Sequence, residues 1–131
     1  MKAIILLFVT LFSSTYNLKG QEEFYQNVLL KEIVAHNFSK AEIDVHSIED
    51  ITLKNSFGNL IQVMEHRGQM RKVDSIFVSK IKLENNSKVI TILNNLTLGF
   101  YTLNNETNNY QGIEYFNKAY TLSKEFNNKE L

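Results

Sequence analysis

The sequence contains no cysteine and no proline, and its 131 residues include five glycines. The lack of cysteine excludes a disulfide scaffold, a thiolate metal site and a cysteine nucleophile. It also fits an oxidising compartment, where a free thiol is a liability. With no proline and few glycines, the chain has few residues that end helices or form tight turns, and it therefore favours long helices.

The chain also carries no net charge at neutral pH. The 14 basic and 14 acidic residues give a formal charge of zero, so no strong field draws nucleic acid or an anionic membrane to the chain. Apolar residues make up 44% of the sequence, which is ordinary for a globular protein. The length suits one domain rather than two.

The first twenty residues have the pattern of a secretory signal peptide. Lys2 gives a positive start, residues 3–12 are almost entirely apolar, and residues 13–17 turn polar. The apolar run is too short to cross about 30 Å of hydrocarbon comfortably as a helix. We therefore expect cleavage after Gly20 and export of residues 21–131 to a periplasmic or extracellular location, with no membrane span in the mature chain. The alternative is a buried N-terminal helix or an uncleaved anchor.

Residues 21–47 are expected to form an N-terminal helix and a loop. The helix runs from Glu22 to His36 and turns four apolar side chains to one side. These are Phe24, Val28, Ile33 and Val34. Residues 38–47 could form either a loop or a short helix. They begin with capping-box spacing, which favours a helix, but then alternate apolar and polar residues as a strand does.

Residues 48–131 are expected to contain two helical hairpins, at 48–84 and 87–127. In the first hairpin, Ser47 caps a helix that ends near Glu65, and a second helix follows after a break around Gly68. Apolar residues recur with helical spacing in both helices. They are Leu53, Phe57, Leu60, Ile61 and Met64 in the first, and Met70, Val73, Phe77 and Ile81 in the second.

The second hairpin has a clearer apolar pattern. Ser87 caps its first helix, residues 104–109 form a polar turn, and its last helix runs from Tyr110 to about Phe126. The expected inward residues again have helical spacing. They are Val89, Leu93, Leu96, Phe100 and Leu103, followed by Ile113, Phe116, Ala119 and Tyr120.

The two hairpins align with each other at an offset of 39 residues, which pairs Phe77 with Phe116 and Val73 with Gly112. Periods of this order are typical of helical solenoids, in which amphipathic hairpins stack because none can bury its apolar face alone. A helical bundle without a true repeat would give the same periodicity. The pattern therefore predicts an all-α fold and leaves these two architectures open.

The second hairpin resembles a tetratricopeptide repeat. Leu98-Gly99 and Phe100-Tyr101 are similar to the large-small pair and the aromatic of that family's first helix, and Gly112, Phe116 and Ala119 have the spacing of its second helix. Small residues let two helices approach closely, and aromatics fill the groove between them. The resemblance implies an all-α fold of antiparallel helical hairpins stacked as a short solenoid that binds a peptide or protein in a concave groove.

The sequence departs from the family pattern in several places. The turn 102–109 is long, Gly112 replaces an alanine, and no proline closes the repeat. Segment 57–84 is a weaker copy in which Lys80 stands where a small residue is expected. The resemblance therefore covers one good repeat and one degenerate one.

Two groups of residues are candidates for peptide binding. Asn59 and Asn95 could hold a peptide backbone through their side-chain amides, as the resemblance implies, and Asn95 lies on the first helix of the better repeat. Arg67, Arg71 and Lys72 could clamp an acidic peptide or a C-terminal carboxylate. The simpler interpretations are an asparagine-rich composition and a solvated helix end.

The sequence has no pattern typical of catalysis. The three histidines at 36, 46 and 66 lie near expected helix ends, where they would interact with the helix dipole, and they have no companions at metal-ligand spacing. Glu49 and Asp50 are adjacent, which suits a helix start better than a catalytic pair. We therefore expect a non-enzyme without metal or cofactor.

The expected function is that of an exported, non-catalytic scaffold that binds a peptide or protein partner and not nucleic acid. Two alternatives remain. One is the N-terminal sensory part of a longer membrane signalling protein, and the other is a closed helical bundle with a structural or small-ligand-binding role.

Overall fold

The structure is a computed structural model that describes residues 29, 31–66, 78–81, 85, 87–105 and 110–128. Its helices are α3 (Phe38–His46), α4 (Ile51–Glu65), α6 (Lys88–Asn105) and α7 (Tyr110–Asn128). Residues 31–34 and 78–79 are also helical, and the described part of the chain contains no strand. The protein is therefore all-α, as its sequence predicts. The expected signal segment and most of the second helix of the first hairpin lie outside the described residues.

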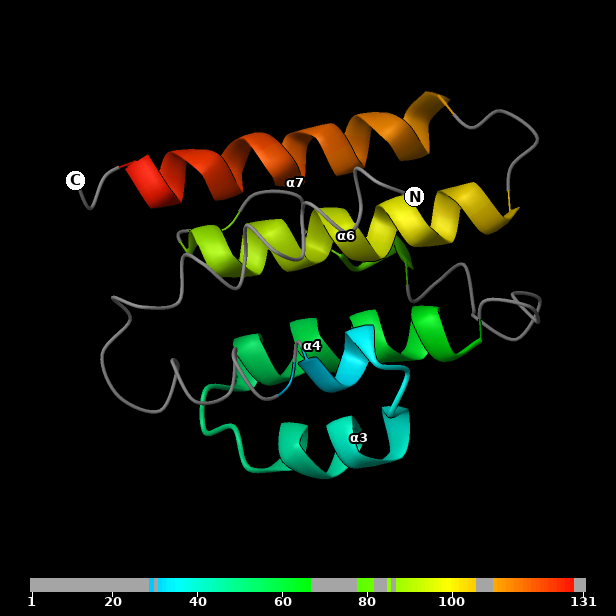
Figure 1. Ribbon diagram of the computed structural model, residues 1–131, viewed down its shortest axis with the longest axis vertical. Coiled ribbons are helices and arrows are strands. Elements are labelled where there is room, and N and C mark those ends of the chain that lie inside the picture. Colours follow the sequence, from blue (N-terminus) through cyan, green and yellow to red (C-terminus); the bar gives the residue numbers. More distant parts are fainter. Residues whose placement is uncertain are drawn as a thin grey trace.

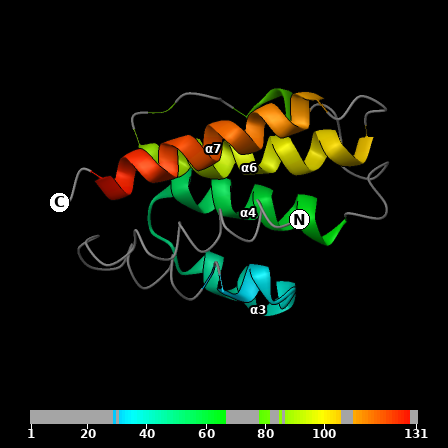
Figure 2. The same ribbon diagram turned by 45° about the horizontal axis from the view of Figure 1, so that its top comes forward.

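The four helices lie in a row in the order α3, α4, α6, α7 (Figures 1 and 2). The extensive contacts among them join α3 to α4, α4 to α6 and α6 to α7, so each helix packs mainly on its neighbours in the row. Helices α4 and α6 run in the same direction, whereas α3 and α7 run in the opposite one (Figure 1). The row thus has α3 and α7 at its two ends.

Residues 38–47, for which the sequence left a loop or a short helix open, form mostly a short helix, α3. Ala41 and Val45 are buried and Phe38 packs against the same core, so the three lie at helical spacing on one face. The strand-like alternation of its last residues is overridden by this packing. Asn37 occupies the N-cap position, but its side chain makes no capping hydrogen bond.

The start of α4 differs from the expectation. The N-cap is Asp50, whose Oδ1 accepts a hydrogen bond from the backbone N–H of Leu53 at 2.9 Å, and not Ser47. Ser47 instead follows α3, where its hydroxyl donates to the carbonyl oxygen of Asp44 at 2.6 Å. An aspartate that caps also complements the positive end of the helix dipole, which explains why the helix begins three residues later.

The apolar face predicted for α4 is confirmed, because all five of its residues are buried (Leu53, Phe57, Leu60, Ile61 and Met64). Helix α6 is buried more widely than an amphipathic pattern predicts, since every residue from Ile90 to Phe100 is buried. Its position inside the row, between α4 and α7, explains why both its apolar stripe and its polar residues are covered.

Two expectations about inward residues and one about a helix end were wrong. Val34 is 41% exposed, because the buried residues of its helix are Leu29, Glu32 and Ile33. Ile113 is 48% exposed. The buried stripe of α7 instead uses small residues and one aromatic at helical spacing, namely Gly112, Phe116, Ala119 and Ser123. Ile81 lies after a turn at Lys80 and is not helical, so the predicted helix to about residue 84 ends earlier.

The turn between the N-terminal helical residues and α3 has a Schellman-type geometry. The N–H of Asn37 donates to the carbonyl oxygen of Glu32 at 2.8 Å, and that of His36 donates to Ile33 at 3.1 Å. His36 has a φ of 58°, the left-handed conformation that this motif requires and that glycine usually supplies. The turn therefore places a residue in the left-handed conformation directly before Asn37, the N-cap of α3.

Candidate functional site

Helices α6 and α7 approach each other closely at two glycines. A Cβ atom on Gly99 would stand 2.9 Å from Phe116 Cε1, and one on Gly112 would stand 2.9 Å from Leu103 Cγ and 3.3 Å from the carbonyl oxygen of Gly99. The two distances of 2.9 Å are shorter than carbon atoms tolerate, so both glycines suit the observed spacing of the helices. The two small residues singled out in the sequence thus lie at one helix contact.

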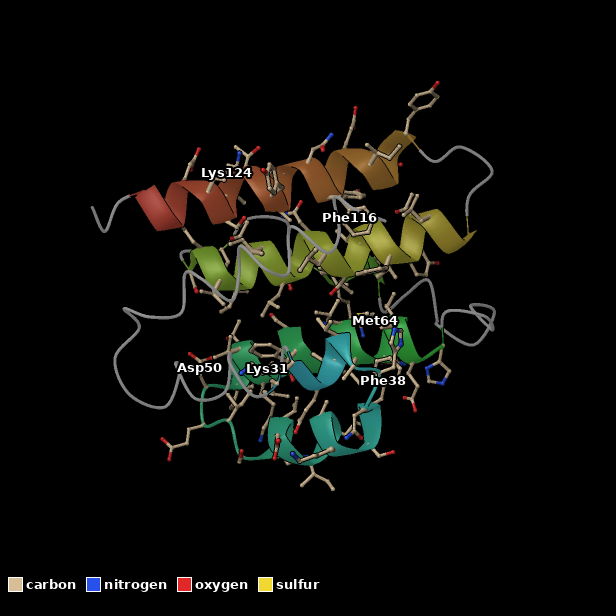
Figure 3. All side chains as sticks on the ribbon, viewed as in Figure 1. Lys31, Phe38, Asp50, Met64, Phe116 and Lys124 are labelled. Atoms are coloured by element: carbon tan, nitrogen blue, oxygen red, sulfur yellow. The ribbon has the colours of Figure 1, made fainter. Side chains whose placement is uncertain are left out.

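Phe116 occupies the space between these two helices (Figure 3). Its ring meets that of Phe100 edge to face, with centroids 5.0 Å apart and an interplanar angle of 80°. Both side chains belong to the buried core. Aromatic pairs with this geometry stabilise a contact beyond the area that they bury. The pair fixes how α7 lies on α6.

The parallel helices α4 and α6 bury equivalent positions 39 residues apart. Leu53 corresponds in this way to Ile92, and Phe57 to Leu96, and all four side chains are buried. A hydrogen bond also recurs at this spacing. The Ser56 hydroxyl donates to the carbonyl oxygen of Thr52 at 3.0 Å, and Asn95 Nδ2 donates to that of Thr91 at 2.8 Å. Because every residue from Ile90 to Phe100 is buried, burial alone does not single out this spacing.

Asn95 is the most unusual polar residue of α6. Its side chain is fully buried, and its Oδ1 has no hydrogen-bond partner among the described residues. Other buried hydroxyls nearby are satisfied by their own helix, as Thr97 is by the carbonyl oxygen of Leu93 at 2.9 Å.

The structure separates the predicted peptide-binding residues. Asn95 lies on α6 and does not reach the surface, whereas Asn59 lies on α4 and is half-buried. Asn55 and Gln62 are exposed on α4, on the side away from its buried stripe. Arg67, Arg71 and Lys72 lie outside the described residues. Of the two predicted asparagines, Asn59 is therefore the one that a partner can reach directly.

An ion pair that the sequence pattern does not reveal joins the N-terminal helical residues to α3. Lys40 Nζ lies 2.7 Å from Glu32 Oε1, and the carboxylate is nearly buried while the lysine is exposed. The hydrogen bond and the charge of Glu32 raise the pKa of Lys40. Glu32 Oε2 has no hydrogen-bond partner among the described residues. The one feature of the sequence that could have indicated this pair is that Glu32 stands at an inward helical position, beside Ile33.

The groups that could carry chemistry are dispersed over the described residues. No cluster of three or more histidine, aspartate or glutamate side chains occurs in these ranges. His46 lies in the last turn of α3, and His66 follows α4 with its Nδ1 2.9 Å from the carbonyl oxygen of Gln62. Asp50 caps α4. His66 and Asp50 thus take part in the ends of α4.

Helices of the described ranges are too short or too polar to cross a bilayer. The fold and the candidate site together define an all-helical protein with a tightly packed hairpin of α6 and α7 and a parallel neighbour, α4. No protein-family model, curated protein or solved structure gives a significant match to the chain.

Proposed function

We propose that this protein is an exported, non-catalytic helical-repeat scaffold of tetratricopeptide type that binds a peptide or protein segment. The observation that carries the proposal is that α4 and α6 are parallel neighbours in contact with each other. Parallel first helices are expected when hairpins stack in series, because each hairpin returns the chain to its starting direction. Up-and-down bundles place antiparallel helices side by side instead.

The tight contact between α6 and α7 supports the same proposal. Gly99 and Gly112 permit the close approach and Phe116 fills the groove, as the family resemblance implies for these positions. Among the four described helices, the extensive contacts join neighbours in the row, which also favours an open array over a closed bundle, in which the first and last helices would meet. An open array leaves helix faces available to a partner.

The accessible binding face in this proposal is the outer side of α4. Asn55, Asn59 and Gln62 present uncharged amides there, and such groups can donate to and accept from a peptide backbone. Gly58 lies among them, with no atom within 4 Å of where its Cβ would stand. A glycine that no internal contact requires leaves room for a peptide to lie close to the helix.

Binding can be tested by selecting short random peptides displayed on phage against the purified chain. The selected peptides should bind an Asn59→Ala/Asn55→Ala variant at least about tenfold more weakly, equivalent to ~1.4 kcal/mol. A Lys118→Ala variant on the exposed side of α7 is the matched control and should bind normally. Failure to select any peptide, or equal loss in the control, would contradict the proposed surface.

Export can be tested separately by measuring the mass of the chain secreted from an expressing bacterium. Removal of residues 1–20 is the expected result, since this segment has the three regions of a signal peptide. A chain retained in the cytoplasm at its full mass would contradict export without affecting the argument for binding.

A further inference from the structure

We draw no further inference here: the strongest candidate, the outer face of α4 where the exposed Ile51 lies one turn from Asn55, belongs to the binding surface already proposed, and nothing in the structure shows what covers it.

Discussion

Replacing glycine by alanine should have opposite effects on stability at positions 58 and 99, although both lie inside helices. Gly99→Ala is expected to lower the free energy of unfolding by about 1–3 kcal/mol, because its Cβ would stand 2.9 Å from Phe116 Cε1, in a ring held by Phe100. Gly58→Ala should raise it by about 0.5–1 kcal/mol, because the new methyl group meets no atom and alanine favours the helix. Denaturant unfolding of the two variants measures both effects.

The pair of variants also tests the helix contact itself. Two stabilised variants would mean that α7 lies farther from α6 than the structure places it, since only helix propensity would then act. Gly112→Ala with Leu103→Ala extends the test, because removing the leucine side chain opens the space that a Cβ on Gly112 would need. We expect the double variant to lose less stability than the sum of the two single ones.

His36 is the described non-glycine residue with a positive φ, and its replacement should stabilise the fold. A left-handed conformation costs a non-glycine residue roughly 1–2 kcal/mol, which glycine avoids while losing some entropy on folding. His36→Gly should therefore raise the free energy of unfolding by about 0.5–1 kcal/mol after this loss. Thermal melts at pH 7.5 would show it.

The matched control is His46→Gly, in the regular last turn of α3. Glycine there should destabilise by up to about 1 kcal/mol, because the helical residue has no strain to relieve. If His36→Gly destabilised the protein to the same extent, the Schellman geometry of residues 32–37 would be excluded.

Asn95 shows how much can be predicted from the sequence for a single residue. Its place on a helix could be predicted from the spacing of Leu93, Leu96 and Phe100, and its amide suggested a binding role. Its complete burial could not be predicted, since an asparagine normally marks the solvated side of an amphipathic helix. Burial there follows from the position of α6 inside the row, which local periodicity does not encode.

At the scale of one element, the start of α4 depends on a single capping carboxylate. Asp50→Ala should lower the free energy of unfolding by about 1 kcal/mol, because the N–H of Leu53 loses its acceptor. Asp50→Asn and Asp50→Ser should retain most of the stability, since both side chains can cap. Glu49→Ala, at the exposed preceding residue, is the control. Equal effects at the two positions would show that charge near the helix start matters rather than the cap.

The ion pair that links the N-terminal helical residues to α3 should stabilise the fold less at alkaline pH. The pKa of Lys40 is raised by Glu32, so protonated Lys40 favours the folded state. This contribution is complete below the unfolded pKa of about 10.5 and is lost as the pH rises through the higher folded value. The exposure of Lys40 keeps the contribution small.

A comparison with Lys40→Met isolates the effect of this pair. The variant should be less stable than the wild type at pH 9, and the difference should shrink above pH 11. Lys118→Met, at an exposed lysine of α7, controls for general effects of alkaline pH. A difference that stays constant between these pH values would mean that Lys40 acts through packing rather than through its charge.

Element boundaries show where sequence patterns are sufficient and where tertiary contacts decide. The apolar residues of α4 and the aromatic positions of the second hairpin were predicted correctly, because burial repeats with the helical period over several turns. Ile113 was misplaced because it is apolar and adjacent to the true stripe, whose small members Gly112 and Ser123 carry no hydrophobic signal. Close helix packing selects small residues, which a count of apolar positions overlooks.

On the scale of the whole molecule, the parallel placement of α4 and α6 could not be derived from either helix alone. A spacing of 39 residues leads to parallel helices only in a fold such as stacked hairpins, where the chain between two equivalent helices reverses direction twice. A closed bundle would satisfy the same apolar periodicities with a different order of neighbours. The helix order is therefore the property that the sequence left open and the structure supplies.

The row arrangement predicts a gradient of stability that hydrogen exchange can measure. Amide groups of α6 should exchange most slowly, because residues 90–100 are buried and lie between two other helices. Those of α3 and α7 should exchange faster, because each packs extensively on only one of the other three helices, and α4 should lie in between. Gly99→Ala should speed exchange in α7 more than in α3, because the altered contact lies beside α7 and two helix interfaces away from α3. Equal protection in all four helices, or equal acceleration in this variant, would instead indicate one closed core in which every helix shares the same contacts.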